Sequence, residues 1–530
     1  MLESPTMVRP PPSPATPPAA SSSAPSPSFI DSHIFHHGAH ESLADWSASV
    51  AAMKELPHGM RQDVARAIDL ARRFNREVVR PLALTLDARI QDDPQHLPWD
   101  FIDEANRWGL FTLWLPRMFG GQGWNMLSMY AFVEEVSTEC VGLANVVGVH
   151  YLGVATLMAT WNLRLARQIF KDVCEGERMG KPCLLSLAIT EPGAGTDVEE
   201  TELVDRARLG TVATPQAGGA YELNGRKVFI SNGHVSTWHM VIAYEDRRKP
   251  ADTMVALAVR TGAAGFSFGA KEQKLGQKAC VASELVFDRC LVPAQQVALA
   301  PRHTAKLGRP HREVAQTMID YVVSSTRAGV GAFATGVARG VFEATRAQVA
   351  GMHCQQGRLI EQQWVQTTLA DMGRHAVLSR LAYMESAMAN CLGGLFALLF
   401  TPPLYQLERW VPRGLMRVCS APLLDSTAFT EWVQQRLLAH YPVAWQNLTS
   451  GLGSMAKVAC SDLAMQNCGL ALSLLGIDGL AHGSGIEKRL RDAKLLQIYE
   501  GTNQLNRINH FKCLLRPDEG VHVFVREDAP

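Results

Sequence analysis

Several features that mark specialised classes of protein are missing from this sequence. Its 530 residues contain no C-x-x-C spacing, and the 11 cysteines are scattered, so neither a disulfide framework nor a metal site is expected. No secretory signal is visible, and no uninterrupted apolar run reaches about 18 residues, the lower limit for a membrane span. Lys+Arg and Asp+Glu are both 51, so no global field attracts nucleic acid. We therefore expect reduced thiols, a cytoplasmic location and no nucleic-acid partner.

What the chain does have is the composition of a folded protein with a large core. It is 47% hydrophobic and 19% charged, and its length suggests about three domains. Residues 1–45 are an exception, because Pro, Ser and Ala dominate there and cannot bury enough surface to offset the entropy of ordering. We expect this tail to be disordered. With Glu3 and only Arg9 as a base, it makes a poor transit peptide.

Residues 46–180 show the spacing of amphipathic helices. Val64, Ile68, Ala71 and Phe74 recur at helical intervals, and we expect Pro81 to end their helix. Residues 181–305 change to short β-rich runs, which predict a β domain. Residues 306–516 return to a helical pattern, and 517–530 form a tail.

Turn signals separate the runs of the β domain. Two of them are the Asn-Gly pairs at 224–225 and 232–233. In the C-terminal part, the final helix is expected from Glu487 to Tyr499, because Gly501 is a natural stop.

Three motifs could carry chemistry. The first, Thr190–Asp197, follows the apolar run LLSLAI, and its glycines let the backbone approach a ligand while its threonines supply hydroxyl donors. An ordinary turn at a strand end has the same pattern. The second, Lys227–Gly233, places Phe229 two residues before Ser231, so an aromatic face and a hydroxyl could meet a planar ring. A plain β-hairpin is the alternative.

The third motif is Glu500, which follows the apolar run LLQIY at a helix end. Burial there would raise the pKa of the carboxylate and fit it to act as a base near neutral pH. A surface glutamate at a helix end is the simpler reading when this motif is taken alone.

Taken together and in this order, the motifs resemble those of the acyl-CoA dehydrogenase family. The resemblance covers about residues 60–515 and marks a divergent member. It rests on FNREVVRP and LPRMFGGQG, then TEPGAGTD, NGRKVFISNG and KLGQKACVASELVFDRCLVP, and finally Arg327 and EKRLRDAKLLQIYEGTNQL. It implies a multi-domain α+β fold with an N-terminal helical domain, a middle β-barrel and a C-terminal four-helix bundle. It also implies FAD, an acyl-CoA substrate, an electron-transferring flavoprotein as partner, and a homodimer or homotetramer.

The same resemblance assigns roles to matching positions. Glu500 would abstract the α-proton of the acyl thioester while a hydride passes from the β-carbon to flavin N5. Cofactor-binding positions would be Leu187, Ala188, Ile189, Thr190, Gly195, Thr196, Phe229, Ile230, Ser231, Thr502, Asn503 and Gln504. Substrate-binding positions would be Thr196, Arg327 and Gly501.

The sequence departs from the family pattern in three ways. In the first, Ser473 stands in place of a glutamine and Ile477 in place of a glycine, and in the second the usual arginine is missing around His353. All three positions are expected contacts with FAD across a subunit interface.

The third departure is additional sequence at about 390–445 in the C-terminal helical domain. Its apolar part could lie on a membrane, with Arg409, Arg413 and Arg417 near the surface, but packing against the bundle or another subunit is favoured.

Two other functions stay open at this stage. An oxidase variant of the same fold would share these motifs, whereas a flavin monooxygenase usually lacks the glutamate. A non-catalytic acyl-CoA- or partner-binding protein is the other alternative. The sequence does not identify the acyl group or show whether its carrier is CoA or a carrier protein.

Overall fold

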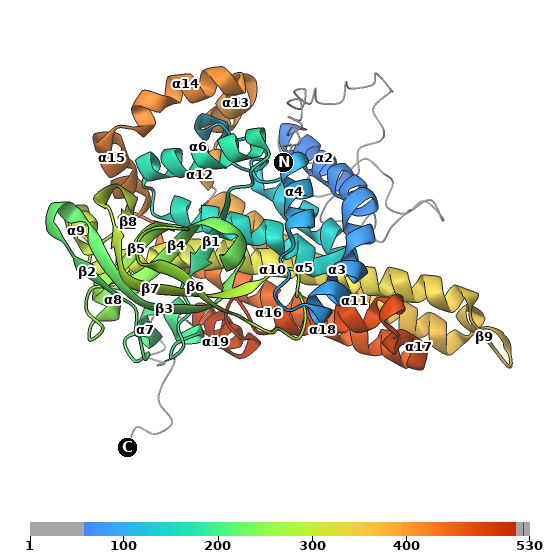
Figure 1. The fold of residues 1–530 in the computed structure, drawn as a ribbon. Coiled ribbons are helices and arrows are strands. Elements are labelled where there is room, and N and C mark those ends of the chain that lie inside the picture. Colours follow the sequence, from blue (N-terminus) through green and yellow to red (C-terminus); the bar gives the residue numbers. More distant parts are fainter. Residues whose placement is uncertain (1–57, 396, 516–522, 524–530) are drawn as a thin grey trace, which may run out of the picture.

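The computed structural model describes residues 58–395, 397–515 and 523. The predicted tail at 1–45 and nearly all of that at 517–530 lie outside the described residues. A helical domain comes first, a β domain follows, and long helices complete the molecule (Figure 1). The predicted order of a helical, a β and a second helical domain is confirmed.

The first helical segment corrects the prediction made at Pro81. Helix α2 (His58–Phe74) continues through a π-helical turn (Asn75–Val79) into α3 (Arg80–Asp92), so the chain stays helical past the proline. A proline ring clashes with the carbonyl four residues earlier in a regular α-helix, and the wider π turn before Pro81 relieves that clash. The rest of this domain comprises α4 (Trp99–Arg107), a 3₁₀ turn (Arg117–Phe119), α5 (Met126–Ala159) and α6 (Leu163–Met179).

Helix α5 consists of two helices joined at Cys140. The backbone of Cys140 is extended, with φ −156° and ψ 105°, so the helix breaks there. Side chains from both halves line one cavity, described below. By length and composition, α5 and α16 (Val443–Leu475) could each cross a membrane. Most of the apolar window of α5 is buried inside the protein, and α16 packs against α10, α11 and α19.

The middle domain is one eight-stranded sheet. Its hydrogen-bonded order is β6-β7-β3-β2-β4-β5-β8, and β1 pairs in parallel with β4. The strands are β1 (Leu184–Ala188), β2 (Val212–Pro215), β3 (Tyr221–Ser231), β4 (Ser236–Tyr244), β5 (Met254–Arg260), β6 (Phe266–Lys271), β7 (Ala282–Val292) and β8 (Val297–Leu299). Short helices α7 (Thr201–Val204) and α8 (Pro250–Thr253) lie between strands, and α9 (Pro301–Thr304) follows β8.

One of the two predicted Asn-Gly turns is absent. Asn224 and Gly225 lie inside β3, where the pairing with β7 shifts register. Gly225 has φ +138°, and a Cβ there would approach the Cα of Thr211 to 2.6 Å. The glycine therefore serves a β-bulge and a close backbone approach instead of a turn. The second pair does form a turn, with Asn232 left-handed at φ +58°.

The C-terminal domain is built on long helices. Helices α10 (His311–Gly351), α11 (Gln363–Gly393) and α16 pack against one another, and α18 (Ile486–Leu496) packs against α10 and α16. The predicted final helix ends earlier than expected, and α19 (Asn503–Leu514) follows it. Glu500 therefore lies in the loop between two helices. A small hairpin, β9 (His353–Cys354) and β10 (Gly357–Arg358), and α17 (Ile477–Leu480) lie at the far end of the bundle (Figure 1).

Four short helices, here called the insertion helices, lie between α11 and α16. They are α12 (Ala397–Phe400), α13 (Pro402–Trp410), α14 (Arg413–Leu424) and α15 (Thr427–Leu437), and they lie beside α6 (Figure 1). Arg409 forms an ion pair with Asp63 at 3.2 Å, and Nε of Arg413 donates to the carbonyl of Gly120 at 2.6 Å. These two arginines therefore contact the N-terminal domain, whereas the alternative favoured by the sequence is packing against the bundle or another subunit.

Candidate active site

The loop between α18 and α19 is held rigidly by side chains. Glu500 and Gly501 are both left-handed, with φ of +54° and +72°. The Asn506 amide donates to the carbonyls of Glu500, Gly501 and Thr502 at 2.9–3.1 Å, and the Lys457 ammonium donates to the Gly501 carbonyl at 2.7 Å. A glutamate with positive φ is uncommon and strained, so the surrounding contacts have to maintain it.

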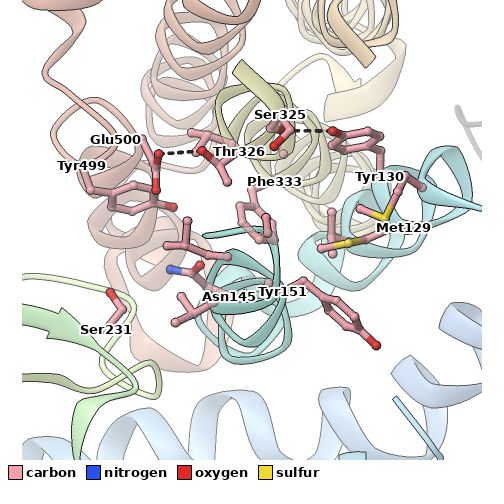
Figure 2. A pocket seen from close by; sticks show the side chains of 18 residues that line it. Met129, Tyr130, Asn145, Tyr151, Ser231, Ser325, Thr326, Phe333, Tyr499 and Glu500 are labelled. Atoms are coloured by element: carbon pink, nitrogen blue, oxygen red, sulfur yellow. Dashed lines mark hydrogen bonds between the residues drawn. The ribbon is translucent and has the colours of Figure 1, made fainter. Parts of the chain in front are cut away.

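The Glu500 side chain faces a cavity beneath this loop. Its Oε2 accepts a hydrogen bond from the Thr326 hydroxyl at 2.7 Å, and Tyr499 lies beside it (Figure 2). Burial raises the pKa of the Glu500 carboxyl, while the Thr326 hydrogen bond and the positive charges of Arg327 and Lys457 oppose the shift. The group is thus a poorly solvated carboxylate whose pKa lies closer to neutrality than that of an ordinary glutamate.

Arg327 connects the loop to the rest of the site. It is fully buried and donates to Glu199 at 2.8 Å, to the Ser454 hydroxyl at 3.1 Å and to the Glu500 carbonyl at 3.4 Å. In this structure Arg327 has no exposed surface and supports the loop, and its contact with the substrate stays a prediction. Gly501 is also buried, and a Cβ there would meet Oε2 of Glu199 at 2.8 Å, so this position needs glycine.

The cavity next to Glu500 is small and mostly apolar. Its volume is about 110 Å³, and both halves of α5, together with α10, supply most of its wall. Phe333 projects into it, Ser231 lies at one side, and Met129 and Tyr130 lie at the other (Figure 2). A carboxylate beside an apolar cavity can remove a proton from a carbon next to an acyl carbonyl while the hydrocarbon part fills the space.

A buried ion pair anchors the Thr190–Asp197 segment. Lys227 contacts Glu191 at 2.7 Å and the Ile189 carbonyl at 2.9 Å. Glu191 also accepts from the backbone N–H groups of Gly210 and Thr211. Glu191 therefore supports the loop. On the accessible side, Thr190 and Thr196 are half-buried and Gly195 is exposed.

The predicted flavin contacts fall into two groups by burial. Ala188 and Ile230 point into the core of the sheet and are fully buried, so contact with a ligand could come only from their backbone. Leu187, Ile189 and Ser231 keep exposed surface.

Phe229 differs from every other predicted contact. Its side chain is 60% exposed, and its backbone is left-handed at φ +58°. The pairing of β3 with β7 shifts register between Lys227 and Ile230, and this irregularity turns the ring out of the sheet. A large aromatic residue rarely adopts positive φ, so the conformation points to a ring presented for contact.

Two of the three residues after Gly501 have structural roles within this chain. The Thr502 hydroxyl caps α19 by accepting from the Leu505 N–H at 3.2 Å. The Asn503 amide donates to Ser461 at 2.9 Å and to Asp462 at 2.8 Å. Gln504 is exposed. Of the three, Gln504 is the side chain most open to a cofactor.

Two of the departures belong to elements at the far end of the bundle from α19, with His353 in β9 and Ile477 in α17, and Ser473 is in the last turn of α16 (Figure 1). Ser473 is exposed and donates to the Gly469 carbonyl, and Ile477 is 79% exposed.

Sequence reasoning missed four residues that shape the site. Thr326, Glu199, Lys457 and Asn506 come from four separate segments and meet around the Glu500 loop. The sequence could have indicated Thr326 and Lys457, because each is a polar residue among small and apolar residues of a long helix, where burial is expected. Glu199 and Asn506 carry no such local signal.

Known proteins share this architecture across nearly the whole chain. Residues 62–177 match the acyl-CoA dehydrogenase N-terminal domain, 186–290 the middle domain, and 317–395 with 431–513 the C-terminal domain. The C-terminal match skips 396–430, which lies inside the predicted insertion.

Curated relatives and solved structures agree with these matches. A probable acyl-CoA dehydrogenase of Mycobacterium leprae is 28% identical over 440 residues, covering 83% of this chain and 92% of its own length. A cyclohex-1-ene-1-carbonyl-CoA dehydrogenase of Geobacter metallireducens is 28% identical over 451 residues, with 85% and 97% covered. The butyryl-CoA dehydrogenase structure from Megasphaera elsdenii superposes with a TM-score of 0.65 at 22% identity, covering 87% of this chain and 99% of that one. This chain therefore belongs to the acyl-CoA dehydrogenase family, whose members depend on flavin, and is an oxidoreductase that acts on acyl-CoA.

Proposed function

We propose that the cofactor is FAD and that Glu500 is the base in an α,β-dehydrogenation of an acyl-CoA thioester. The observation that carries this proposal is the Glu500 carboxylate, which is half-buried, has a raised pKa and faces an apolar cavity. A base must be close to the proton it takes and have a pKa near the working pH. Among the described residues that line this cavity, Glu500 is the only carboxylate.

The residues around the loop fit a flavin ring. Phe229 is an exposed aromatic residue next to Val228, whose backbone N–H donates to the Thr190 carbonyl at 3.0 Å, and Thr190, Thr196 and Ser231 are only partly buried. At Gly195 a Cβ would meet only a Thr190 methyl group at 4.0 Å, which leaves open space above the loop. When bound there, a flavin supplies the two-electron oxidant that accepts hydride from the β-carbon of the substrate.

The chain itself supplies the proton transfer and its geometry. The Glu500 carboxylate takes the α-proton, and the backbone N–H of the same residue would donate to the thioester carbonyl, where negative charge develops. Asn506, Lys457 and Arg327 hold the loop, so this donor and the base keep a fixed separation. Apolar side chains of α5 and α10 exclude water from the reacting carbons.

An anaerobic titration with acyl-CoAs of different chain lengths tests the function. We expect the purified protein to be yellow and its flavin absorbance to bleach with at least one chain length. A protein that retains FAD but bleaches with none of them would contradict the proposal.

Replacing Thr326 by valine should move the acid limb of the pH–rate profile to higher pH. The Thr326 hydroxyl lowers the pKa of Glu500, so its loss lets that pKa rise and leaves less ionised base at low pH. The expected loss is severalfold on the acid side and small at high pH. Thr335→Val is the matched control, because that hydroxyl donates to the Gly331 carbonyl on the same helix. An unshifted profile for Thr326→Val would refute the assigned hydrogen bond.

Replacing Phe229 by alanine should weaken FAD binding by about tenfold, since aromatic stacking contributes roughly 0.5–1.5 kcal/mol beyond its area. The dissociation constant can be measured by adding FAD to the apoprotein and following flavin fluorescence. Leu291→Ala is the control, because Leu291 is an equally exposed apolar side chain of the same domain, on β7. Equal affinity for both variants would remove Phe229 from the cofactor site.

We also propose a homo-oligomer, a cytoplasmic location and an electron-transferring flavoprotein as electron acceptor. The exposed apolar side chains Trp364, Ile477 and Leu480 at the far end of the bundle support the oligomer. All 11 cysteines are free, which fits a reducing compartment.

A further inference from the structure

A second and much larger cavity lies between the insertion helices and the N-terminal domain. Its volume is about 800 Å³, inside the range of roughly 300–1,000 Å³ that is typical of ligand sites. Trp114, Val154 and Met158 line it from the N-terminal domain, and Leu404, Met416 and Leu424 line it from the insertion helices.

The charged groups at the rim of this chamber are already paired. The Glu408 carboxylate accepts from the backbone N–H groups of Arg117 and Met118 at 2.8 and 3.3 Å. Arg409 pairs with Asp63 at 3.2 Å. Because these polar groups are satisfied within the protein, the chamber offers hydrocarbon surface to its occupant.

The chamber shares a wall with the cavity that Glu500 faces. Met126, Tyr151 and Ala155 of α5 line both, so these side chains form part of the wall between the two spaces. The Tyr151 hydroxyl points away from Glu500 (Figure 2) and is fixed there, donating to the Leu110 carbonyl at 2.7 Å and accepting from the Trp114 N–H at 3.2 Å. Met126 has a flexible unbranched side chain and Ala155 a small one. A movement of Met126 can therefore open a passage between the two cavities.

We propose that the chamber takes the distal part of a long, unbranched acyl chain whose thioester lies at Glu500. This inference rests on the proposed function. The cavity of about 110 Å³ next to Glu500 is too small for more than a short acyl group, and the chamber of about 800 Å³ lies directly beyond it. The family match skips 396–430, so the helices that cover the chamber are largely this chain's own. The insertion thus sets the chain length.

Two variants that reduce the space from different sides test the proposal. Val154→Phe fills the chamber from α5 at a position that does not line the cavity at Glu500, and Met416→Trp fills the chamber from α14. Val418→Trp is the control, because Val418 is on the same helix but is 65% exposed and does not line the chamber. With the full-length holoenzyme and an artificial electron acceptor, kcat/KM is measured for butyryl-CoA and palmitoyl-CoA.

Wild-type protein should prefer palmitoyl-CoA. Each methylene kept out of an apolar site costs roughly fourfold, so both variants should lower the palmitoyl-to-butyryl ratio of kcat/KM by at least about tenfold. Activity on butyryl-CoA and the control variant's ratio should stay unchanged.

Three outcomes separate the possibilities. Equal losses on both substrates would overturn the inference, since the variants would then have damaged packing alone. A wild-type enzyme that works well on butyryl-CoA but has no activity on palmitoyl-CoA would overturn it while leaving the proposed function intact. Failure with every acyl-CoA would overturn the proposed function, and the inference with it.

Discussion

Replacing Glu500 by glutamine is expected to lower the rate of flavin bleaching by about 10²–10⁴-fold, the usual contribution of a positioned general base. Glutamine keeps the length and shape of the side chain and can still bond to the Thr326 hydroxyl, so the loop should keep its conformation. Stopped-flow absorbance under anaerobic conditions measures the rate. Binding of the acyl-CoA, followed by its perturbation of the flavin spectrum, should be retained.

The control for that experiment is Glu361→Gln, an exposed glutamate far from the site, which should leave the rate unchanged. In the wild-type protein the rate should fall as pH decreases through the raised pKa of Glu500, because only the ionised carboxylate can accept a proton. Bleaching at the normal rate by Glu500→Gln would show that another group is the base.

Replacing Arg327 by methionine is expected to destabilise the protein by about 3–5 kcal/mol and to abolish activity, because it leaves the Glu199 carboxylate buried without its partner. The pKa of Glu199 is already raised to about 7 by burial, although Arg327 opposes the shift. Thermal unfolding of the holoenzyme measures the change. Glu199→Gln in the same chain should recover part of the loss, since it removes the unpaired charge.

The pH dependence of that loss has a definite sign. A carboxylate whose folded pKa lies above its unfolded value contributes stability below the unfolded pKa, and this contribution is lost as pH rises through the folded value. Removing Arg327 lets the pKa of Glu199 rise further, so the variant should be closest to wild type near pH 5 and weakest above pH 7. Arg167→Met is the matched control, because its partner Asp425 is exposed and the pair should contribute less than about 1 kcal/mol. An equal effect at both pH values would contradict the role given to Glu199.

Patterns that depend on neighbours in sequence predicted the fold well. Changes in the spacing of hydrophobic residues indicate the order of the three domains. They also indicate the strand that precedes Thr190, and both features are present in the structure. Pro81 and Asn224-Gly225 show where such patterns fail. Both are strong local signals, yet a π turn accommodates the proline and a β-bulge uses the glycine, because the packing of the whole element outweighs the local preference.

The candidate site was predictable only in part for a related reason. Glu500 stands out in sequence because it sits in a distinctive motif, but its hydrogen-bond partner Thr326 lies 174 residues earlier. The contact between Arg327 and Glu199 spans 128 residues. No pattern within one segment encodes such pairs, and they arise only when α10, α16 and the loop after α18 come together.

The bonds that join the insertion helices to the N-terminal domain also bear on how the protein assembles. The hydrogen bond between Arg117 and Glu408 connects residues 291 positions apart, so a very large loop must close before it can form. Contacts of such long range form late in folding, after the local helices and the sheet. We expect the wall of the larger chamber to be the last part of the molecule to form during folding and the first to open during unfolding. The N-terminal and C-terminal domains would then stop unfolding as one cooperative unit before either domain unfolds.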